Sequence, residues 1–372
     1  MTSNTSNAAP TNSLAAQTNP DFQRIIDDIV DTGFVGIQLR VTDEHREWVG
    51  TAGLSALGET APPPSNGRVR IGSNTKTFVA TAVLQLVAEG KIALDTPAAH
   101  YLPHLAIDPR ITVRMLLQHT SGIFNFTGEV LEDGTIVPGV VAWSGKDWVD
   151  NRLRGRDVLD LVRQALALPA RFEPGTDWSY SNTNYAIARL LIEAVTGDPL
   201  AQVMQRQILE PLGLTDTLVP ENSTELGGPH AHAYYRYDDA GKQRTVDVTV
   251  SDPSWISSGG DMISTSKDLH TFIRALVTGK LLPAPLLADM LTPESKVGYG
   301  LGVIVQHTRS GTVITHNGGH GGHAALMYST ADGSKTMTAA LNYVDDADLT
   351  LSEPFQQATQ RLIEEVFGGP AA

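Results

Sequence analysis

The stretch Gly72-Ser73-Asn74-Thr75-Lys76-Thr77-Phe78-Val79 stands at the front of a long apolar run, and the organisation of the chain follows from it. The apolar residues recur with helical spacing and stop before Gly90; they are Phe78, Val79, Ala82, Val83, Leu86 and Val87. The spacing predicts a helix buried along a broad stripe. Because residues three apart share a helix face, the Ser73 hydroxyl and the Lys76 amine are expected to lie side by side.

This pair suggests nucleophilic chemistry. A serine hydroxyl becomes an effective nucleophile when a neighbouring base takes its proton, and a partly buried lysine can be that base. Free backbone N–H groups at a helix start can also stabilise a developing oxyanion. A second pair with the same spacing, Ser264 and Lys267, lacks this context, since Ser266 before Lys267 has the pattern of an ordinary helix N-cap.

Composition limits the possible functions. The chain has 372 residues, of which 41% are hydrophobic and 18% charged, which predicts a globular protein with a large core. A net charge of −14 without any Lys/Arg run argues against nucleic acid and against an anionic membrane surface. No apolar run is long enough to span a membrane. The absence of cysteine excludes disulfides, thiol catalysis and cysteine metal sites.

Residues 1–20 are rich in Ser, Thr, Asn, Ala and Pro and contain neither the basic nor the apolar region of an export signal. They are expected to form a disordered tail. If Met1 is the native start, the missing signal predicts a cytoplasmic protein. If the sequence is a trimmed piece, a secreted or periplasmic location stays open.

Strand patterns occur at both ends of the chain and helical patterns between them. Strands are expected at 34–41, 47–52, 299–306, 311–316, 322–329 and 335–342. Helices are expected at 21–31, 113–118, 155–166, 183–195, 201–209, 267–277 and near the C-terminus around Leu362. This order predicts an α/β fold of the α+β type, with a central antiparallel sheet flanked by helices and an inserted all-helical lobe. The expected division is 21–90 with 256–372 for the sheet domain, and 91–255 for the mostly helical insertion.

Trp178-Ser179-Tyr180-Ser181-Asn182 precedes one of the predicted helices. A tyrosine beside a lysine can shuttle a proton, and Asn182 can donate an amide N–H to a substrate carbonyl. The simpler alternative is a helix N-cap at Asn182 next to a packed Tyr180.

The segment 315–323, Thr-His-Asn-Gly-Gly-His-Gly-Gly-His, is the other unusual stretch. Its glycines leave backbone N–H groups unshielded, so an edge strand here can clamp a substrate or donate to an oxyanion. The alternative is a metal site at His316, His320 and His323, but no Asp, Glu or Cys accompanies them. No metal or cofactor is therefore expected. For His119 and Ser121, in a segment without the G-x-S-x-G of a nucleophile elbow, structural capping is the expected role.

Ser73-x-x-Lys76, Tyr180-Ser181-Asn182 and His316-Asn317-Gly318 follow one another in the chain. This order resembles the penicillin-recognising serine hydrolases, which carry S-x-x-K, then S-D-N or Y-x-N, then K-T-G or a variant. The likeness extends from about Phe34 to Phe367. It also includes the segments 86–95 (LVAEGKIALD), 117–122 (LQHTSG), 180–185 (YSNTNY) and 298–302 (GYGLG). The resemblance implies a β-lactamase-like fold.

The resemblance also implies roles for the motif residues. Ser73 would be the acylated nucleophile, and Lys76 with Tyr180 would form the base that takes its proton and returns it to the leaving group. His316 would replace the lysine of K-T-G and tune the Tyr180 proton. The oxyanion hole would consist of the backbone N–H groups of Ser73 and Gly319.

The remaining implied contacts concern the substrate. Asn182 would bind its amide, Asn317 and Gly318 would line the site, and Trp255 would form an aromatic wall of the cleft. Carboxypeptidases of this kind bind a terminal carboxylate with hydroxyl residues after the His and an arginine on the preceding strand. Here those places hold Asn317, Gly319 and Val303-Ile304-Val305. An unpaired buried carboxylate is costly, so a neutral leaving group fits better.

The sequence therefore predicts a serine hydrolase that forms an acyl-enzyme on amide or ester bonds, most favourably a D-amino-acid amidase or D-peptidase acting on a small molecule or short peptide. The alternatives are a D-alanyl-D-alanine carboxypeptidase or transpeptidase and a carboxylesterase. A β-lactamase is less favoured, because no dedicated deacylating carboxylate is identified. From other classes, a non-catalytic penicillin-binding sensor and a metallohydrolase using the histidine cluster stay open. The sequence gives no oligomeric state.

Overall fold

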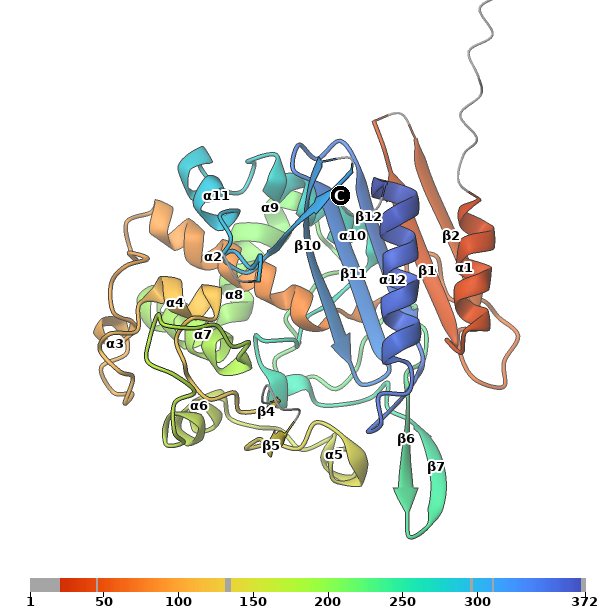
Figure 1. Ribbon diagram of the computed structural model, residues 1–372, viewed down its shortest axis with the longest axis horizontal. Helices are drawn as coiled ribbons and strands as arrows, with labels where there is room; N and C mark the ends of the chain where they lie inside the picture. The colour runs from red at the N-terminus through yellow and green to blue at the C-terminus, as the bar shows by residue number, and fades with distance from the viewer. Residues whose placement is uncertain (1–20, 45, 131–134, 295–296, 310, 369–372) are drawn as a thin grey trace, which may run out of the picture.

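The computed structural model describes residues 21–44, 46–130, 135–294, 297–309 and 311–368, so the tail predicted for residues 1–20 lies outside the described residues. Its centre is a six-stranded sheet whose neighbouring strands are all antiparallel (Figure 1). In order across the sheet, the strands are β2 (Glu47–Gly53), β1 (Gly36–Thr42), β12 (Thr336–Asn342), β11 (His323–Thr330), β10 (Gly311–His320) and β9 (Ile304–Thr308). The predicted sheet, assembled from both ends of the chain, is confirmed.

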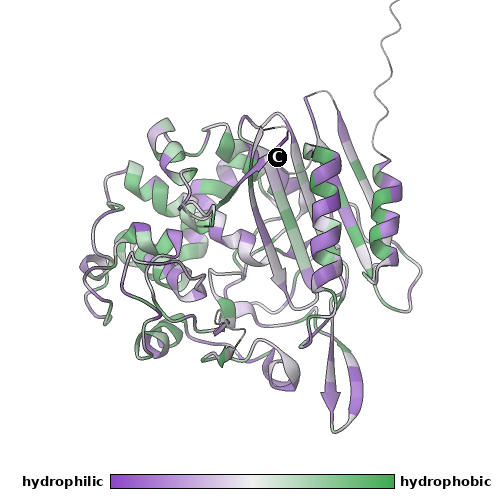
Figure 2. Cartoon of the chain, viewed as in Figure 1, coloured by the Kyte–Doolittle hydropathy of each residue, from purple (hydrophilic) through white to green (hydrophobic). Residues whose placement is uncertain are grey.

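Side chains alternate between the two faces of this sheet. Met337, Ala339 and Leu341 of β12 pack in one cluster with the helices α1 (Phe22–Asp31) and α12 (Ser352–Phe367). Figure 2 shows these two helices with apolar and polar stripes, as expected for helices that cover a sheet on one side. Ala340 belongs to the cluster on the opposite face, where α10 (Ser266–Val277) contacts β12, β11 and β1.

The helix predicted after Ser73 is α2 (Thr75–Ala88), which lies beside the sheet in the middle of the molecule (Figure 1). It is buried continuously from Thr75 to Leu84, so neighbours surround it on all sides. It packs against α7 (Asn182–Thr196), the helix that follows the Tyr180 segment. The other helices of this part are α3 (Ala98–Tyr101), α4 (Val113–Gln118), α5 (Gly145–Asn151), α6 (Val158–Leu166), α8 (Leu200–Met204), α9 (Glu210–Leu212) and α11 (Ala284–Met290).

The segment expected to be mostly helical also contains strands that the sequence analysis missed. β6 (Tyr234–Asp239) and β7 (Lys242–Asp247) form a hairpin that projects from the molecule (Figure 1), and β13 (Val344–Asp346) pairs with β6 in parallel. The turn residues Ala240 and Gly241 both have positive φ, which is typical of a tight two-residue hairpin turn. A shorter hairpin joins β4 (Gly128–Val130) and β5 (Ile136–Pro138). The division into two domains stays a prediction.

The C-terminal strands also depart from their expected bounds. Tyr299 makes only an isolated bridge to Ile304, so β9 starts later than predicted. β10 continues through the glycine-rich stretch to His320, whereas its pairing with β9 ends at Thr315. From His316 onward, β10 has β11 on one side and no β9 residue on the other. This places the His-Asn-Gly-Gly residues on a free stretch of strand edge, beside the start of α2.

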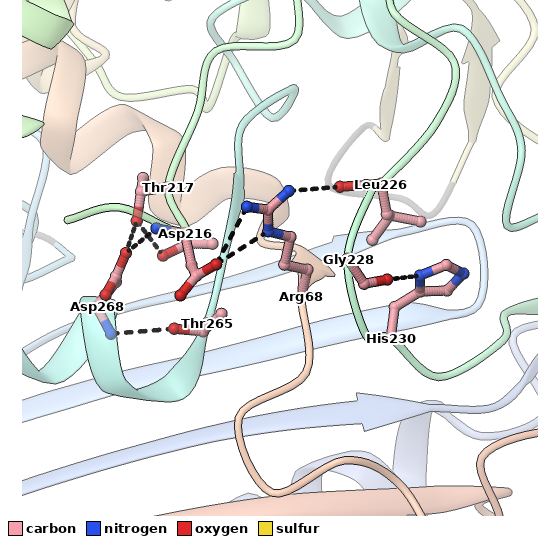
Figure 3. Close-up of polar contacts among 9 residues, drawn as sticks. Arg68, Asp216, Thr217, Leu226, Gly228, His230, Thr265 and Asp268 are labelled. Atoms are coloured by element: carbon pink, nitrogen blue, oxygen red, sulfur yellow. Dashed lines mark hydrogen bonds and ion pairs between the residues drawn. The ribbon is translucent and has the colours of Figure 1, made fainter.

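A short strand, β3 (Val69–Arg70), pairs with β8 (Ile263–Ser264) and delivers the chain to Ser73. Arg68, which precedes β3, donates to the Asp216 carboxylate at 3.1 Å and 3.3 Å and to the Leu226 carbonyl at 3.4 Å (Figure 3). The ion pair thus connects this approach to two loops. Within the described part of the chain, no helix has the length and apolar character needed to traverse a lipid bilayer.

Candidate active site

Ser73 was expected at the start of the α2 helix. It lies instead in a single 3-10 turn, η1 (Gly72–Asn74), directly before that helix. This turn packs against β10. A Cβ added at Gly72 would clash with the Gly319 backbone, and one added at Gly318 would clash with the Ser73 nitrogen and the Ile71 carbonyl oxygen. Gly72 also has φ of +50°, which glycine adopts without strain. These two glycines allow the backbone of Ser73 to lie against the edge of β10.

The Ser73 hydroxyl lies between the two partners predicted for it. Its Oγ is 3.3 Å from Lys76 Nζ and 2.7 Å from the Tyr180 hydroxyl, which donates to it. Lys76 is fully buried, and its Nζ also donates to Asn182 Oδ1 at 2.7 Å and to the Gly259 carbonyl at 2.6 Å. The amine stands 4.5 Å from the centre of the Tyr180 ring. Residues from three separate segments, around Ser73, Tyr180 and Gly259, therefore meet at the Ser73–Lys76 pair.

Burial determines the protonation states here. Desolvation lowers the pKa of Lys76 well below 10.5, against the opposing charge of Asp261. Desolvation raises the pKa of Tyr180, against its hydrogen bond to Ser73, so the phenol stays neutral. A neutral amine has two N–H donors for Asn182 and Gly259, and its lone pair is left for the Ser73 proton. The geometry can therefore pass the serine proton to Lys76 while Tyr180 donates to Oγ.

Asp261, whose charge opposes the lowering of the Lys76 pKa, is completely buried. Burial raises the pKa of its carboxyl, whereas the backbone N–H of Ser258 and the charges of Arg189 and Lys76 act in the opposite direction. Ser258 has φ of +53°, a strained conformation for a residue other than glycine. The strained turn carries Gly259, whose carbonyl accepts from Lys76. The sequence analysis assigned no role to Gly259.

His316 lies on β10 near this centre, but its contacts differ from the expected ones. Burial, with a contribution from the Lys76 charge, lowers the pKa of His316 to about 3, so the ring is neutral. Nδ1 donates to the Asn317 carbonyl at 2.8 Å, which leaves Nε2 to accept from the Tyr299 hydroxyl at 3.0 Å. The recorded partner of His316 is thus Tyr299 and not Tyr180. The only sequence signal for Tyr299 was its place in the Gly-Tyr-Gly-Leu-Gly stretch.

The predicted substrate-binding residues occupy different positions. Asn182 is the first residue of α7, after the N-cap Ser181, so the alternative of an Asn182 cap is wrong. Its amide accepts from Lys76 and donates to Thr127 at 3.0 Å, so both ends are already engaged. Gly318 faces η1, and Gly319 is exposed beside it.

Asn317 is the exception among these residues. Its side chain donates to the Tyr328 hydroxyl at 2.7 Å, and Tyr328 belongs to the cluster under α12 on the other face of the sheet. The prediction that the Asn317 side chain lines the site is wrong, because successive residues of a strand point to opposite faces. Only its backbone remains on the site side. Trp255 is half-buried at the end of β10, with its ring 5.5 Å from that of His320.

His119 was expected to have a structural role, and it does form the left-handed C-cap of α4. It also lies under Tyr180, with the two ring centres 4.4 Å apart. Its Nδ1 accepts from the Ser181 backbone N–H at 3.2 Å and stands 3.1 Å from Asn184 Nδ2. Because a backbone N–H can only donate, Nδ1 is unprotonated, in agreement with the lowered pKa of this buried ring. His119 therefore holds the turn that carries Tyr180, a contact that the sequence analysis did not assign.

The three histidines proposed as an alternative metal site do not converge. His316 is engaged by Tyr299, His320 packs on Trp255, and His323 Nε2 lies 3.1 Å from the Ala231 carbonyl. Within the described ranges, no group of three or more His, Cys, Asp or Glu side chains could hold a metal ion. The groups at Ser73, a buried lysine amine and a tyrosine hydroxyl, instead suit acyl transfer.

A family model described as Beta-lactamase matches residues 22–355. Among curated proteins, the putative penicillin-binding protein PbpX of Bacillus subtilis is 30% identical over 63% of this chain and 53% of its own length. Esterase EstB of Burkholderia gladioli is 32% identical over 55% of this chain and 51% of its length. The chain thus spans about half of each of these two relatives.

Solved structures match over more of their length. A D-stereospecific amidohydrolase from Streptomyces sp. superposes with a TM-score of 0.79 at 34% identity, with 94% of this chain and 98% of that chain covered. The D-amino acid amidase of Ochrobactrum anthropi SV3 gives a TM-score of 0.78 at 24% identity, over 93% of this chain and 98% of the other. The second likeness concerns the fold alone.

Proposed function

Because this chain belongs to the Beta-lactamase family, whose members are serine hydrolases, we propose that it hydrolyses amide or ester bonds through an acyl-enzyme on Ser73. The observation that carries this proposal is the position of the Ser73 hydroxyl between a buried lysine amine at 3.3 Å and a tyrosine hydroxyl at 2.7 Å. A hydroxyl held in this way has a base for its proton and a donor for proton return.

In the proposed reaction, Ser73 Oγ attacks the substrate carbonyl as its proton moves to Lys76. The backbone N–H groups of Ser73 and Gly319 would stabilise the oxyanion, which is consistent with the contact between η1 and β10. Tyr180, hydrogen-bonded to Oγ, would relay a proton from Lys76 to the leaving group. Water would then cleave the acyl ester and regenerate Ser73.

His316, Tyr299 and Asn182 support this centre in the proposal. Asn182 fixes the direction of the Lys76 amine through the 2.7 Å hydrogen bond. His316 and Tyr299 form a neutral hydrogen-bonded pair. The pair lies beside Tyr180, since the Tyr299 ring stands 6.4 Å from the Tyr180 ring at nearly a right angle. Neutral polar walls keep the phenol from ionising before substrate arrives. Trp255 would limit the cleft at the far end of β10.

For the substrate, we favour amides of D-amino acids or short D-peptides with a neutral leaving group. The positions where carboxypeptidases of this kind bind a terminal carboxylate are Asn317, Gly319 and 303–305 in this chain. None of them holds an arginine or a hydroxyl side chain. The 34% identity to a protein named as a D-stereospecific amidohydrolase, over nearly both whole chains, supports the same class. A D-alanyl-D-alanine carboxypeptidase or transpeptidase and a carboxylesterase are the next candidates, the latter favoured by the 32% identity to EstB over part of the chain.

The deciding experiment compares kcat/KM for a D-amino-acid amide, its L enantiomer and an acyl-D-Ala-D-Ala peptide, with Ser73→Ala as the blank. The proposal expects the D-amide to exceed the peptide by about tenfold or more, which corresponds to about 1.4 kcal/mol in the transition state. A better peptide substrate would indicate a DD-peptidase. Undiminished activity of Ser73→Ala on all substrates would contradict the serine mechanism itself.

A penicillin measurement separates the enzyme from the sensor. Mass spectrometry after incubation with benzylpenicillin would detect an adduct on Ser73. An adduct that persists for hours, in a protein that turns over no amide or ester, would indicate a penicillin-binding sensor.

A further inference from the structure

We infer that a small cavity beside the His320 end of β10 is a subsite for a carboxylate on the acyl part of the substrate. This deepens the proposed function and rests on it. The cavity has a volume of about 40 Å³, enough for more than one water-sized group. Arg152, Arg154 and Arg156 line it together with Trp148 and Trp255.

Unsatisfied donors distinguish this cavity. Trp148 Nε1, Trp255 Nε1 and Arg152 Nε are buried and have no hydrogen-bond partner among the described residues, and all three side chains line the cavity. Trp148 is only 3% exposed. Buried donors are normally paired, and each one left unpaired costs about 1–3 kcal/mol. All three groups are N–H donors, so their natural partner is a group that only accepts, and an ionised carboxylate is such a group.

Charge points to the same ligand. Within the described ranges, the side chains of Arg152, Arg154 and Arg156 make no ion pair, although the chain carries a net charge of −14 and acidic partners are abundant. Nearby Arg163, in contrast, lies 3.8 Å from the Asp160 carboxylate. Guanidinium groups bind carboxylates through paired hydrogen bonds. Asp147 also lines the cavity, and the three arginines outweigh its negative charge.

The cavity lies where the acyl group of a bound substrate would extend. Trp148 packs against Gly321 and Trp255 against His320, just past Gly319. A strand advances about 3.3 Å per residue, so the cavity begins about 7 Å beyond the proposed oxyanion donor Gly319. Tyr180, the proposed proton donor to the leaving group, lies toward the opposite, His316 end, since both residues contact Tyr299. The leaving group therefore occupies the His316 end, and an acyl side chain ending in a carboxylate reaches toward the arginines.

The test uses two substrates that differ only in charge, the α-p-nitroanilides of D-glutamic acid and D-glutamine. The acidic protein repels anions at long range, so a preference for the glutamyl substrate requires a local cationic site. The expected kcat/KM ratio of glutamyl to glutaminyl substrate is about ten or more in the wild type. Arg152→Gln and Trp148→Phe should reduce the ratio severalfold. Arg154 is exposed, so Arg154→Gln should keep the fold and reduce the ratio as well.

Arg163→Gln is the matched control, because Arg163 lies on α6 outside the cavity, and it should keep the wild-type ratio. A wild-type ratio at or below one, a ratio that the arginine variants leave unchanged, or turnover of neither substrate would overturn the carboxylate subsite. Ser73-dependent hydrolysis of the glutaminyl substrate in the first two cases would leave the proposed function intact. Hydrolysis of both substrates by Ser73→Ala would instead overturn the proposed function, and the subsite with it.

Discussion

Lys76 shows at the scale of one residue how burial creates reactivity. An ammonium in the protein interior loses its hydration. The surroundings of Lys76 supply carbonyl oxygens from Asn182 and Gly259, and none of the described carboxylates lies within ion-pairing distance of it. The neutral amine of Lys76 is therefore favoured at a pH far lower than that of a lysine side chain in water. A lysine of this kind can accept a proton at the pH where a cell works.

This argument fixes the sign of the pH dependence. Since Lys76 must be unprotonated to act as the base, kcat/KM should rise about tenfold per pH unit below the Lys76 pKa and level off above it. The lowered pKa places that plateau well below pH 10.5. A pH profile for hydrolysis of p-nitrophenyl acetate measures it, and Lys76→Met should lose about 10²- to 10⁴-fold in kcat/KM. A profile that still rises steeply near pH 10 would show that Lys76 is charged in the free enzyme.

His119 should act on Tyr180 through position. His119→Ala would leave the Ser181 N–H without its acceptor and the Asn184 Nδ2 group without its contact to the ring, at a cost of about 1–3 kcal/mol for each buried group. Thermal unfolding should show the lost stability, and kcat should fall with KM little changed, because Tyr180 would lose its support beside Ser73.

His119→Gln is the matched control, since its side-chain carbonyl can accept from the same donors. It should recover part of both stability and kcat. A purely structural role for His119 would instead lower the unfolding temperature of His119→Ala and leave kcat of the folded fraction unchanged.

The motif residues of the site could be predicted from the sequence, whereas their supports could not. The i, i+3 spacing within one helical segment limits the distance between Ser73 and Lys76 before any tertiary structure is known. His119, Tyr299 and the Gly259 carbonyl approach the centre from distant loops. Their contacts depend on how those loops pack, and neither periodicity nor residue type reveals it. The Asn317 side chain was misplaced because β10 was predicted to end at His316, so the alternation of its faces was not applied.

At the scale of elements, the contact between η1 and β10 aligns the nucleophile with the strand edge. A methyl group at Gly318 would push the Ser73 nitrogen away, while at Gly319 the nearest atoms to an added Cβ are 3.8 Å and 3.9 Å distant. Gly318→Ala should therefore abolish most Ser73 acylation, and Gly319→Ala should keep the fold and the backbone N–H.

The two variants form a matched pair, since each adds one methyl group to neighbouring residues of the same strand. The rate at which benzylpenicillin labels Ser73, followed by mass spectrometry, measures the difference. Equal labelling of both variants would show that the separation between η1 and β10 does not control the nucleophile.

The hairpin formed by β6 and β7 was missed for a reason that belongs to this scale. Its strand residues, Tyr-Tyr-Arg-Tyr-Asp-Asp and Lys-Gln-Arg-Thr-Val-Asp, are largely polar, and β7 is mostly exposed. The buried face is small: Tyr235 is buried, and Tyr237 and Val246 pack against the same cluster. So few apolar positions among polar residues give little alternation for a sequence pattern to detect. The buried strands β11 and β12 were predicted within one residue of their bounds, because they contain apolar runs that turn residues separate.

At the scale of the whole molecule, Arg68 connects the approach to Ser73 with the loops around Asp216 and Leu226 (Figure 3). The pair is partly open to solvent, with side-chain exposures of 20% for Arg68 and 42% for Asp216. Screening limits such a pair to about 1 kcal/mol or less. Arg68→Ala should thus lower the unfolding temperature by a few degrees and leave kcat unchanged.

A double-mutant cycle with Asp216→Ala isolates the pair, because removal of both partners should cost less than the sum of the single losses. Strict additivity of the two changes in unfolding free energy would show that Arg68 stabilises the chain through Leu226 and packing alone.

The pairing of β1 with β12 also determines when, during synthesis of the chain, the active site can assemble. Gly36 is paired with Asn342, so the sheet that backs η1 stays incomplete until β12 has been synthesised. Contacts this distant in sequence form late, after a large loss of chain entropy. A nascent chain on the ribosome already carries Ser73, Lys76 and Tyr180 but lacks β10, so it has no aligned strand edge. The Ser73 backbone therefore meets its strand edge only after β10 has been synthesised, later than Ser73, Lys76 and Tyr180 themselves.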